Sequence, residues 1–172
     1  SDQKIQIAKE ALKIDPTFGD AYQVIGYAYK AKGEFDNAFA AFSKAIELTP
    51  TLAYAYYERG GITFLYRNDP TGAIPDFEKV IEYDPDSYLA YFAKGRIEYA
   101  QKKFDAAIAS YSRGLELSPD NTDALGNRGN IYFAKGDYDR ALADYDIGIK
   151  LKPDDAVSYH NRGLIYHKKG IP

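Results

Sequence analysis

The two histidines of the chain are the first residues to consider for chemistry, because imidazole is a common metal ligand and acid–base group. His160 and His167 are seven residues apart. On a helix this spacing puts both on one face but about 10 Å apart along the axis. One metal ion would not easily reach both, and no third ligand is evident. We therefore predict surface imidazoles and no metal site.

Other residue types that catalyse reactions give no pattern either. The chain has no cysteine, which excludes disulfides, thiolate nucleophiles and cysteine-based zinc sites. Its 25 acidic residues are scattered as on solvated helix faces. No phosphate-binding loop, nucleophile elbow or metal motif is present. We predict no catalytic residue and no cofactor, and hence a protein that is not an enzyme.

The residues that do show order are small ones that recur along the chain. One glycine returns at intervals of 34 or 35 residues, at Gly26, Gly60, Gly95, Gly129 and Gly163. A proline, an alanine and an aromatic residue four places after the alanine keep the same period. They are Pro16, Pro50, Pro85, Pro119 and Pro153; Ala38, Ala73, Ala107 and Ala141; and Phe42, Phe77, Tyr111 and Tyr145. A fixed period of this length indicates a repeat protein.

Each period contains the signals of two helices. In residues 19–32, Tyr22, Ile25 and Tyr29 follow helical spacing on one face. Gly33 should end this helix, and residues 35–48 form a second apolar stripe that ends before Pro50. The sequence predicts four such pairs, with a lone helix before Pro16 and another at residues 156–169.

These positions resemble the tetratricopeptide repeat (TPR), and the resemblance covers nearly the whole chain. It implies an all-α fold, a right-handed solenoid of stacked antiparallel helix pairs. We expect a single domain over residues 1–172, with a half repeat at 1–16, repeats at 19–50, 53–85, 88–119 and 122–153, and a final helix at 156–169. Thr63, Glu98 and Leu125 depart from the usual aromatic positions without breaking the period.

The recurring glycine lies inside a helix, where it costs about 1 kcal/mol relative to alanine. We predict that Gly129 faces Ala141 of the partner helix, so that the two backbones approach closely. Gly136 is expected to end the helix.

The residue before this glycine suggests ion pairs inside the repeat. Arginine at 59 and 128 is accompanied by Asp76 and Asp144 on the second helix of the same repeat. An arginine in a semi-buried position needs a partner. We predict the pairs Arg59–Asp76 and Arg128–Asp144; independent exposure of the four side chains to water is the alternative.

The stretch YRNDPTGAIPDF, residues 66–77, carries the one inserted residue. Asp69 and Pro70 are predicted as the N-cap and first residue of the next helix. Pro75 is expected to remove a backbone hydrogen bond and bend that helix.

In the TPR family the first helices of the pairs line a concave groove that commonly binds a peptide or a partner helix. The resemblance places the groove three residues before, one after and four after each glycine. The predicted peptide-binding residues are Tyr27, Tyr57, Phe64, Phe92, Arg96, Tyr99, Asn130, Phe133 and His160. The rings could instead pack between neighbouring helices, and the sequence leaves this open.

One TPR subclass clamps the terminal carboxylate of chaperone peptides, and the chain resembles it only in part. Asn130 and Asn161 match its two asparagines, but Gly126 replaces the first lysine. We predict that this clamp is absent.

The charge and hydropathy of the chain narrow the class of partner. The net charge is −3 and the pI about 5.4, which is unlike a nucleic-acid-binding protein. No apolar run is long enough to span a membrane. The prediction is a scaffold for an unidentified protein or peptide; the alternative is a homo-oligomer in which the terminal half repeats pair head-to-tail. Because the chain begins Ser-Asp-Gln and lacks methionine, we expect a fragment or processed form of a longer protein.

Overall fold

The computed structural model describes residues 2–170, and all the regular structure in this range is α-helical. The helices are α1 (Asp2–Ile14), α2 (Gly19–Ala31), α3 (Phe35–Leu48), α4 (Ala53–Leu65), α5 (Ile74–Tyr83), α6 (Tyr88–Ala100), α7 (Phe104–Leu117), α8 (Thr122–Ala134), α9 (Tyr138–Leu151) and α10 (Ala156–Lys168). The predicted all-α repeat solenoid is confirmed. None of these helices is long and apolar enough to cross a membrane.

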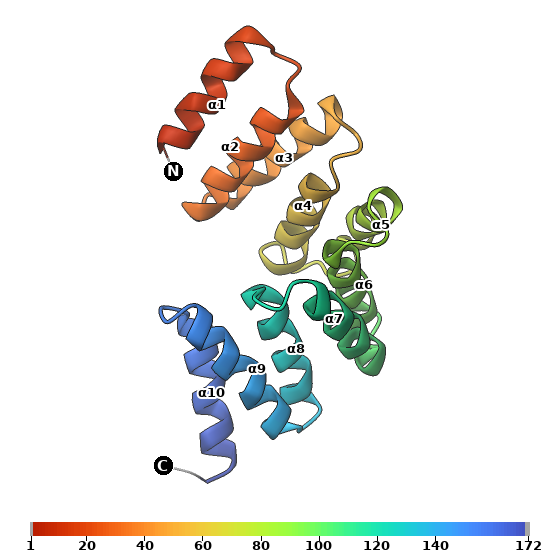
Figure 1. Cartoon of the computed structure of the whole chain (residues 1–172), viewed down its shortest axis with the longest axis vertical. Helices are drawn as coiled ribbons and strands as arrows, with labels where there is room; N and C mark the ends of the chain where they lie inside the picture. Colours follow the sequence, from red (N-terminus) through yellow and green to blue (C-terminus); the bar gives the residue numbers. More distant parts are fainter. Residues whose placement is uncertain (1, 171–172) are drawn as a thin grey trace. The chain divides into compact units, whose positions relative to one another are not determined.

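The helices alternate between two kinds. The A helices, which carry the recurring glycine, are α2, α4, α6, α8 and α10; the B helices are α1, α3, α5, α7 and α9. The chain divides into two compact units, one up to Pro85 and one from Asp86. The first unit contains α1 to α5, and the second contains α6 to α10. Figure 1 shows α2 beside α3 in the first unit and α9 beside α10 in the second.

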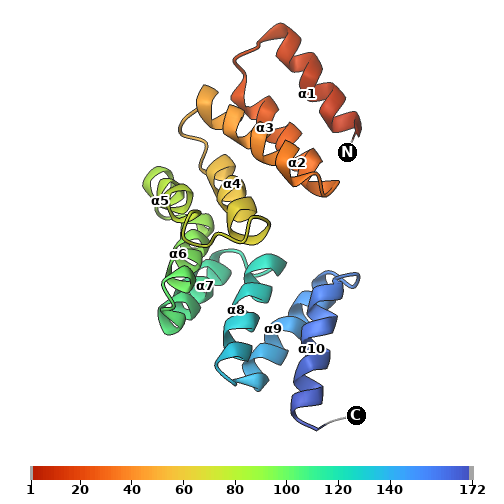
Figure 2. The same cartoon turned by 180° about the vertical axis from the view of Figure 1, so that it is seen from behind.

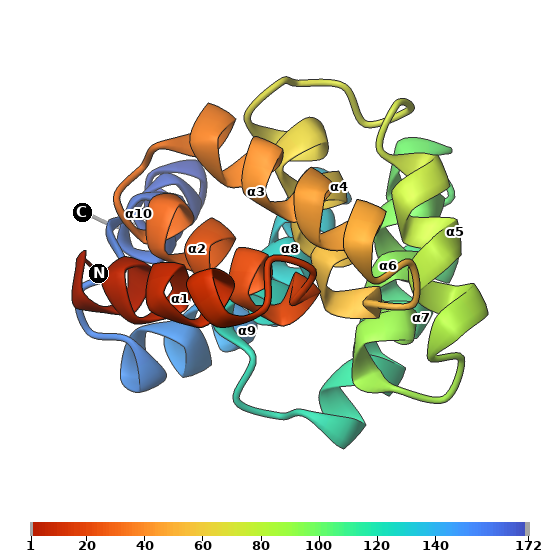
Figure 3. The same cartoon turned by 90° about the horizontal axis from the view of Figure 1, so that it is seen from above.

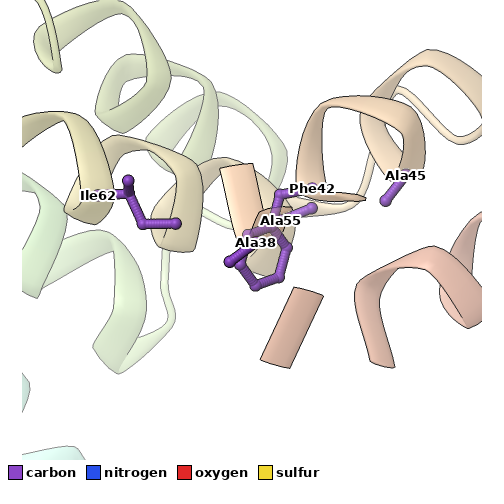
Figure 4. Packing of buried hydrophobic residues seen from close by; sticks show 5 residues of the cluster. All are labelled: Ala38, Phe42, Ala45, Ala55 and Ile62. Atoms are coloured by element: carbon purple, nitrogen blue, oxygen red, sulfur yellow. The ribbon is translucent and has the colours of Figure 1, made fainter. Parts of the chain in front are cut away.

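The core of the first unit forms where the small and aromatic residues of α3 meet the next A helix. Ala38, Phe42 and Ala45 have no exposed surface, and Ala55 and Ile62 of α4 pack against them. Figure 4 shows the Phe42 ring next to Ala38 and Ala55. Burying a phenylalanine side chain contributes about 1.5–3 kcal/mol. The alanines keep the helices close enough for the ring to be enclosed.

The second unit repeats this arrangement between α8, α9 and α10, which Figure 2 shows from behind. Its core contains Tyr132, Ala141, Tyr145 and Ile165. Ala141 and Ile165 are fully buried, and Tyr145 is 1% exposed. The same two positions of the B helix, a small residue and a ring four places later, therefore build both cores.

The recurring glycine makes room for that ring. A Cβ placed on Gly129 would lie 2.8 Å from the ring of Tyr145, and one on Gly26 would lie 2.7 Å from the ring of Phe42. Both distances are too short for a real carbon contact. The prediction that Ala141 faces Gly129 was therefore wrong: the nearest atoms to the glycine belong to the aromatic side chain one helical turn later, Tyr145.

Glycine also ends two of the A helices as predicted. Gly33 and Gly136 have φ angles of +76° and +77°, in the left-handed region that side chains rarely adopt. Each follows the C-cap residue of its helix, Lys32 or Lys135, and turns the chain toward the next B helix.

The connection between α4 and α5 differs from its prediction. α5 begins at Ile74, so Asp69 and Pro70 do not start the helix. Asp69 instead accepts a hydrogen bond from the backbone N–H of Gly72, at 2.8 Å, and stabilises a turn. Pro75 lies in the first turn of α5, where its missing N–H removes no helical hydrogen bond. Figure 3 shows this long connection between the two helices.

Candidate functional site

The predicted ion pairs between A and B helices are both formed. Nε and Nη2 of Arg128 donate to Oδ2 and Oδ1 of Asp144, at 2.9 and 2.6 Å. Arg59 binds Asp76 with the same two atoms at the same two distances. The aspartate is the first cause of the raised pKa of each arginine, through its hydrogen bonds. This two-point geometry fixes the A helix against its B helix.

Each arginine also contacts the preceding repeat, which the sequence analysis did not predict. Nη1 of Arg128 donates to Oγ of Ser112 on α7 at 2.9 Å, and Nη1 of Arg59 donates to Oγ of Ser43 on α3 at 3.4 Å. Both serines directly follow the ring position of the earlier B helix, and that placement was the signal in the sequence. One guanidinium therefore joins three successive helices.

The repeat that contains α6 and α7 uses a different pair of polar residues. Oγ of Ser110 donates to Oε2 of Glu98 at 2.6 Å. Ser110 occupies the aspartate position of the other repeats, and Glu98 occupies the position of Tyr132. The departure from the aromatic pattern at Glu98 thus has a partner on α7.

In the first unit, aromatic side chains on the A helices lie against the rings of the B helices. The centroid of Tyr27 is 5.5 Å from Phe42 and 6.4 Å from Tyr54, in both cases edge to face. Tyr27 is half-buried, whereas Tyr54 is 41% exposed. The two tyrosines come from α2 and α4, so they form one surface across neighbouring A helices.

Tyr57 and Phe64 of α4 complete the set predicted in the first unit. Both pack on Phe77 of α5, with centroid separations of 5.9 and 6.2 Å. Phe77 is fully buried, while Tyr57 and Phe64 are half-buried. The exposed parts of these rings are therefore held by a rigid core residue.

A salt bridge links the same two A helices. Nζ of Lys30 on α2 lies 2.5 Å from Oε2 of Glu58 on α4. The Glu58 side chain is 11% exposed and that of Lys30 is 38% exposed. Glu58 was not among the predicted residues, although it stands two places before the glycine of α4.

Two residues predicted in the second unit lie in its interior. Phe92 is 1% exposed and Arg96 is 5% exposed. The ring of Phe92 occupies the space beside Gly114 of α7, where a Cβ would lie 2.3 Å from it. The equivalent residues of α3 and α5 are Ala45 and Val80, so this second glycine was the signal that Phe92 turns inward. Neither Phe92 nor Arg96 offers surface to a partner.

Tyr99 and Phe133 have equivalent surroundings on α6 and α8. Their centroids lie 5.8 Å from Phe104 and 5.7 Å from Tyr138, each the first residue of the next B helix. Tyr99 is 38% exposed and Phe133 is half-buried. Each ring therefore packs on a B-helix ring with one side and is partly exposed to solvent on the other.

Asn130, on the exposed side of α8, is hydrogen-bonded to α9 and to α10. Its Oδ1 accepts from the hydroxyl of Tyr145 at 2.6 Å and from Nδ2 of Asn161 at 2.9 Å. Burial raises the pKa of Tyr145 to about 12. With its oxygen occupied twice, the Asn130 amide can offer its N–H groups to a carbonyl oxygen.

The two histidines lie on exposed surface of α10. Across residues 2–170, no three His, Asp or Glu side chains come together in a way that could hold a metal ion. The side chains described on the A helices are rings, amides and ion pairs.

Three family models match the chain. One described as TPR repeat matches residues 26–65 and 129–170, and two described as tetratricopeptide repeat match residues 58–122 and 110–143. A curated relative, small glutamine-rich tetratricopeptide repeat-containing protein 2 of Mycosarcoma maydis, is 42% identical over 50 residues. This segment is 29% of the chain and only 14% of that relative.

Solved structures with a similar fold include MamA protein, with a TM-score of 0.57 and 28% identity over 90% of this chain and 84% of that one. The APC/C hetero-tetramer Cut9–Hcn1 gives a TM-score of 0.83 at 20% identity, over 98% of this chain and 34% of that one. YrrB, described as a TPR protein with an unusual peptide-binding site, gives 0.57 at 24% identity, over 93% and 82%. The last two similarities concern the fold alone.

Proposed function

The chain belongs to the tetratricopeptide repeat family, and we propose that it is a non-catalytic scaffold whose A-helix faces bind a peptide segment or helix of a partner protein. Proteins of this family are generally scaffolds for protein–protein interactions. One protein of this fold, YrrB, is described as having a peptide-binding site.

The observation that carries the proposal is that partly exposed rings of the A helices pack on buried rings of the B helices. In the first unit Tyr27 rests on Phe42, and Tyr57 and Phe64 rest on Phe77. A ring held in place loses little conformational entropy when a partner covers it, and aromatic residues of this kind often dominate binding energy.

The polar groups of the A helices indicate which chemical groups a bound peptide should carry. In the second unit, Asn130 can donate to a backbone carbonyl, and the side chains of Tyr99, Phe133 and His160 are partly or largely exposed. In the first unit, Lys30 and Glu58 present both charges within one salt bridge. A segment with apolar side chains and accessible backbone amides fits these groups better than a highly charged one.

The proposed site is therefore smaller than the sequence predicts. The first unit presents Tyr27, Tyr57 and Phe64, and the second unit, taken by itself, presents Tyr99, Asn130, Phe133 and His160. Phe92 and Arg96 act as core residues instead.

Selection of peptides from a random library on the full chain tests this function. We expect the selected peptides to lose at least about tenfold in affinity when Tyr27 and Tyr57 are both changed to alanine. Leu117→Ala is the matched control, because this B-helix leucine is 48% exposed and apolar but lies outside the site. Peptides that bind the double variant unchanged, or that are lost with Leu117→Ala, would contradict the proposal.

The head-to-tail alternative fits the residues of α1 less well. By the repeat period, Lys4 stands where the other B helices have a fully buried alanine such as Ala38 or Ala141. Ala8 stands where they have the ring that covers the glycine of an A helix. Pairing α1 with α10 of another molecule would bury a lysine and leave Gly163 uncovered.

A further inference from the structure

α10 exposes a face that every other A helix buries against the B helix that follows it. At Gly26, Gly60, Gly95 and Gly129, a Cβ would meet a ring of that helix at 2.7–2.9 Å. At Gly163 no atom lies within 4 Å. Tyr159, four residues earlier, is 44% exposed, whereas the equivalent Tyr56 of α4 is 8% exposed. The space for a ring is present on α10, and no described residue fills it.

The hydrogen bonds of Arg162 indicate that a negatively charged group would fit beside that space. Nη1 of Arg162 donates to Oδ1 of Asp146 on the preceding helix at 2.9 Å, as Nη1 of Arg128 donates to Ser112. The other two nitrogens of Arg128 bind Asp144 on the following helix. Among residues 2–170, Nε and Nη2 of Arg162 have no such acceptor. One half of this guanidinium is therefore positioned for a carboxylate that would come from a further helix.

We propose that this face of α10 binds an amphipathic helix of a partner chain that carries the pattern Ala-x-x-Asp followed directly by Tyr or Phe. The ring would cover Gly163, the aspartate would bind Nε and Nη2 of Arg162, and the alanine would allow the close approach. The chain itself supplies the template twice, as Ala73, Asp76 and Phe77 on α5 and as Ala141, Asp144 and Tyr145 on α9. This docking surface is separate from the ring-bearing face proposed above.

A second copy of the chain is a poor occupant of this face. The rings of α3, α5, α7 and α9 are at most 2% exposed, held against their own A helices. Within residues 2–170, α1 is the one B helix that follows no A helix, but it carries Ala8 at the ring position and Lys4 at the small position. Neither α1 nor any other B helix of a second copy therefore supplies the complementary pattern within residues 2–170.

A helical peptide with the sequence of residues 137–152, the α9 segment, is the probe. A covalent staple between positions 143 and 147, which are exposed in α9, holds it helical, because a free peptide of this length is only marginally helical. Titration into the full chain is expected to show saturable binding, weakened at least about tenfold when the peptide's Tyr145 or Asp144 is replaced by alanine.

Gly163→Ala tests the site on the protein. Its Cβ meets open space in the free chain, so folding is preserved, but it would stand where the ring enters. Gly126→Ala is the matched control, since Gly126 is another A-helix glycine with no atom within 4 Å. We expect Gly163→Ala to weaken probe binding at least about tenfold and Gly126→Ala to leave it unchanged.

Three results would overturn the proposal. They are no binding of a probe shown by circular dichroism to be helical, at concentrations up to about 1 mM; binding that Gly163→Ala does not change; and concentration-dependent self-association of the chain that Gly163→Ala abolishes. The last would identify a second copy as the occupant.

Discussion

Arg128 and Asp144 form a two-point ion pair between α8 and α9, with the carboxylate side chain of Asp144 only 4% exposed. Removing one partner of such a pair leaves the other charge without compensation in a poorly hydrated place. The pair therefore acts as one unit in the stability of the repeat.

Arg128→Leu and Asp144→Ala are each expected to lower the free energy of unfolding by about 2–4 kcal/mol. The double variant should lose less than the sum of the two, by at least about 1 kcal/mol, because the second change removes a charge that is already unpaired. Urea denaturation of the four proteins measures this coupling. Asp146→Ala is the control, since the Arg162–Asp146 pair is more exposed and is worth at most about 1 kcal/mol. Additive losses at residues 128 and 144 would show that the two side chains act separately.

Alanine at two glycines of the same helix should have opposite effects. Gly129→Ala would put a Cβ 2.8 Å from the Tyr145 ring, and the overpacking should lower the free energy of unfolding by about 1–3 kcal/mol. Gly126→Ala meets open space and should raise it by up to about 1 kcal/mol through helix propensity. Thermal and urea unfolding of the two variants provide the comparison, and equal effects would contradict the role assigned to the ring.

The buried Tyr145 should make the protein less stable in alkali. Its pKa in the folded protein is raised to about 12, above the ordinary value of about 10 that applies when the chain unfolds. The unfolded state therefore loses the proton first, and the stabilisation present below pH 10 is lost as the pH rises from 10 to 12, by about 2–3 kcal/mol in all. Urea denaturation at several pH values in this range measures it.

Tyr145→Phe separates this effect from the other tyrosines of the chain. The variant loses the hydrogen bond to Asn130, so it should be less stable at pH 8, but it cannot ionise at this position. Its loss of stability between pH 10 and 12 should be smaller than that of the unmodified chain. An identical slope in both proteins would assign the alkaline effect to other residues.

Phe92 and Tyr99, both predicted to bind peptide, should respond very differently to truncation. Phe92→Ala removes a 1% exposed ring and should cost about 3–5 kcal/mol of unfolding free energy. Tyr99→Ala removes a 38% exposed ring and should cost about 1 kcal/mol or less. Chemical denaturation distinguishes them, and a large loss for Tyr99→Ala would remove it from the proposed binding face.

The period of the small residues predicted the helix pairs, and the resemblance to the tetratricopeptide repeat predicted that the pairs stack into a solenoid. The prediction of α3 as residues 35–48 matches its observed bounds. Covariation inside a single chain also identified Arg59–Asp76, because the arginine and the aspartate appear together and vanish together.

The sequence was less informative where side-chain direction matters. Phe92 and Tyr57 hold the same place in their repeats, but Gly114 opens a space that draws only Phe92 inward. The start of α5 was misplaced because an aspartate before a proline suits a turn as well as a helix, and Asp69 binds Gly72 in such a turn. The direction of Phe92 and the start of α5 both depend on contacts with neighbouring residues, and the helical period of the sequence does not predict such contacts.

The hydrogen bond from Tyr145 to Asn130 connects the sealed interior of the second unit to its accessible side. A ligand that rotates the Asn130 amide would weaken or strengthen the hydrogen bond that this amide accepts from the buried Tyr145. Occupancy and folding then become thermodynamically linked, and the linkage must be reciprocal. A ligand that binds at Asn130 would therefore change the free energy of unfolding of the second unit, and a denaturation curve would detect its binding.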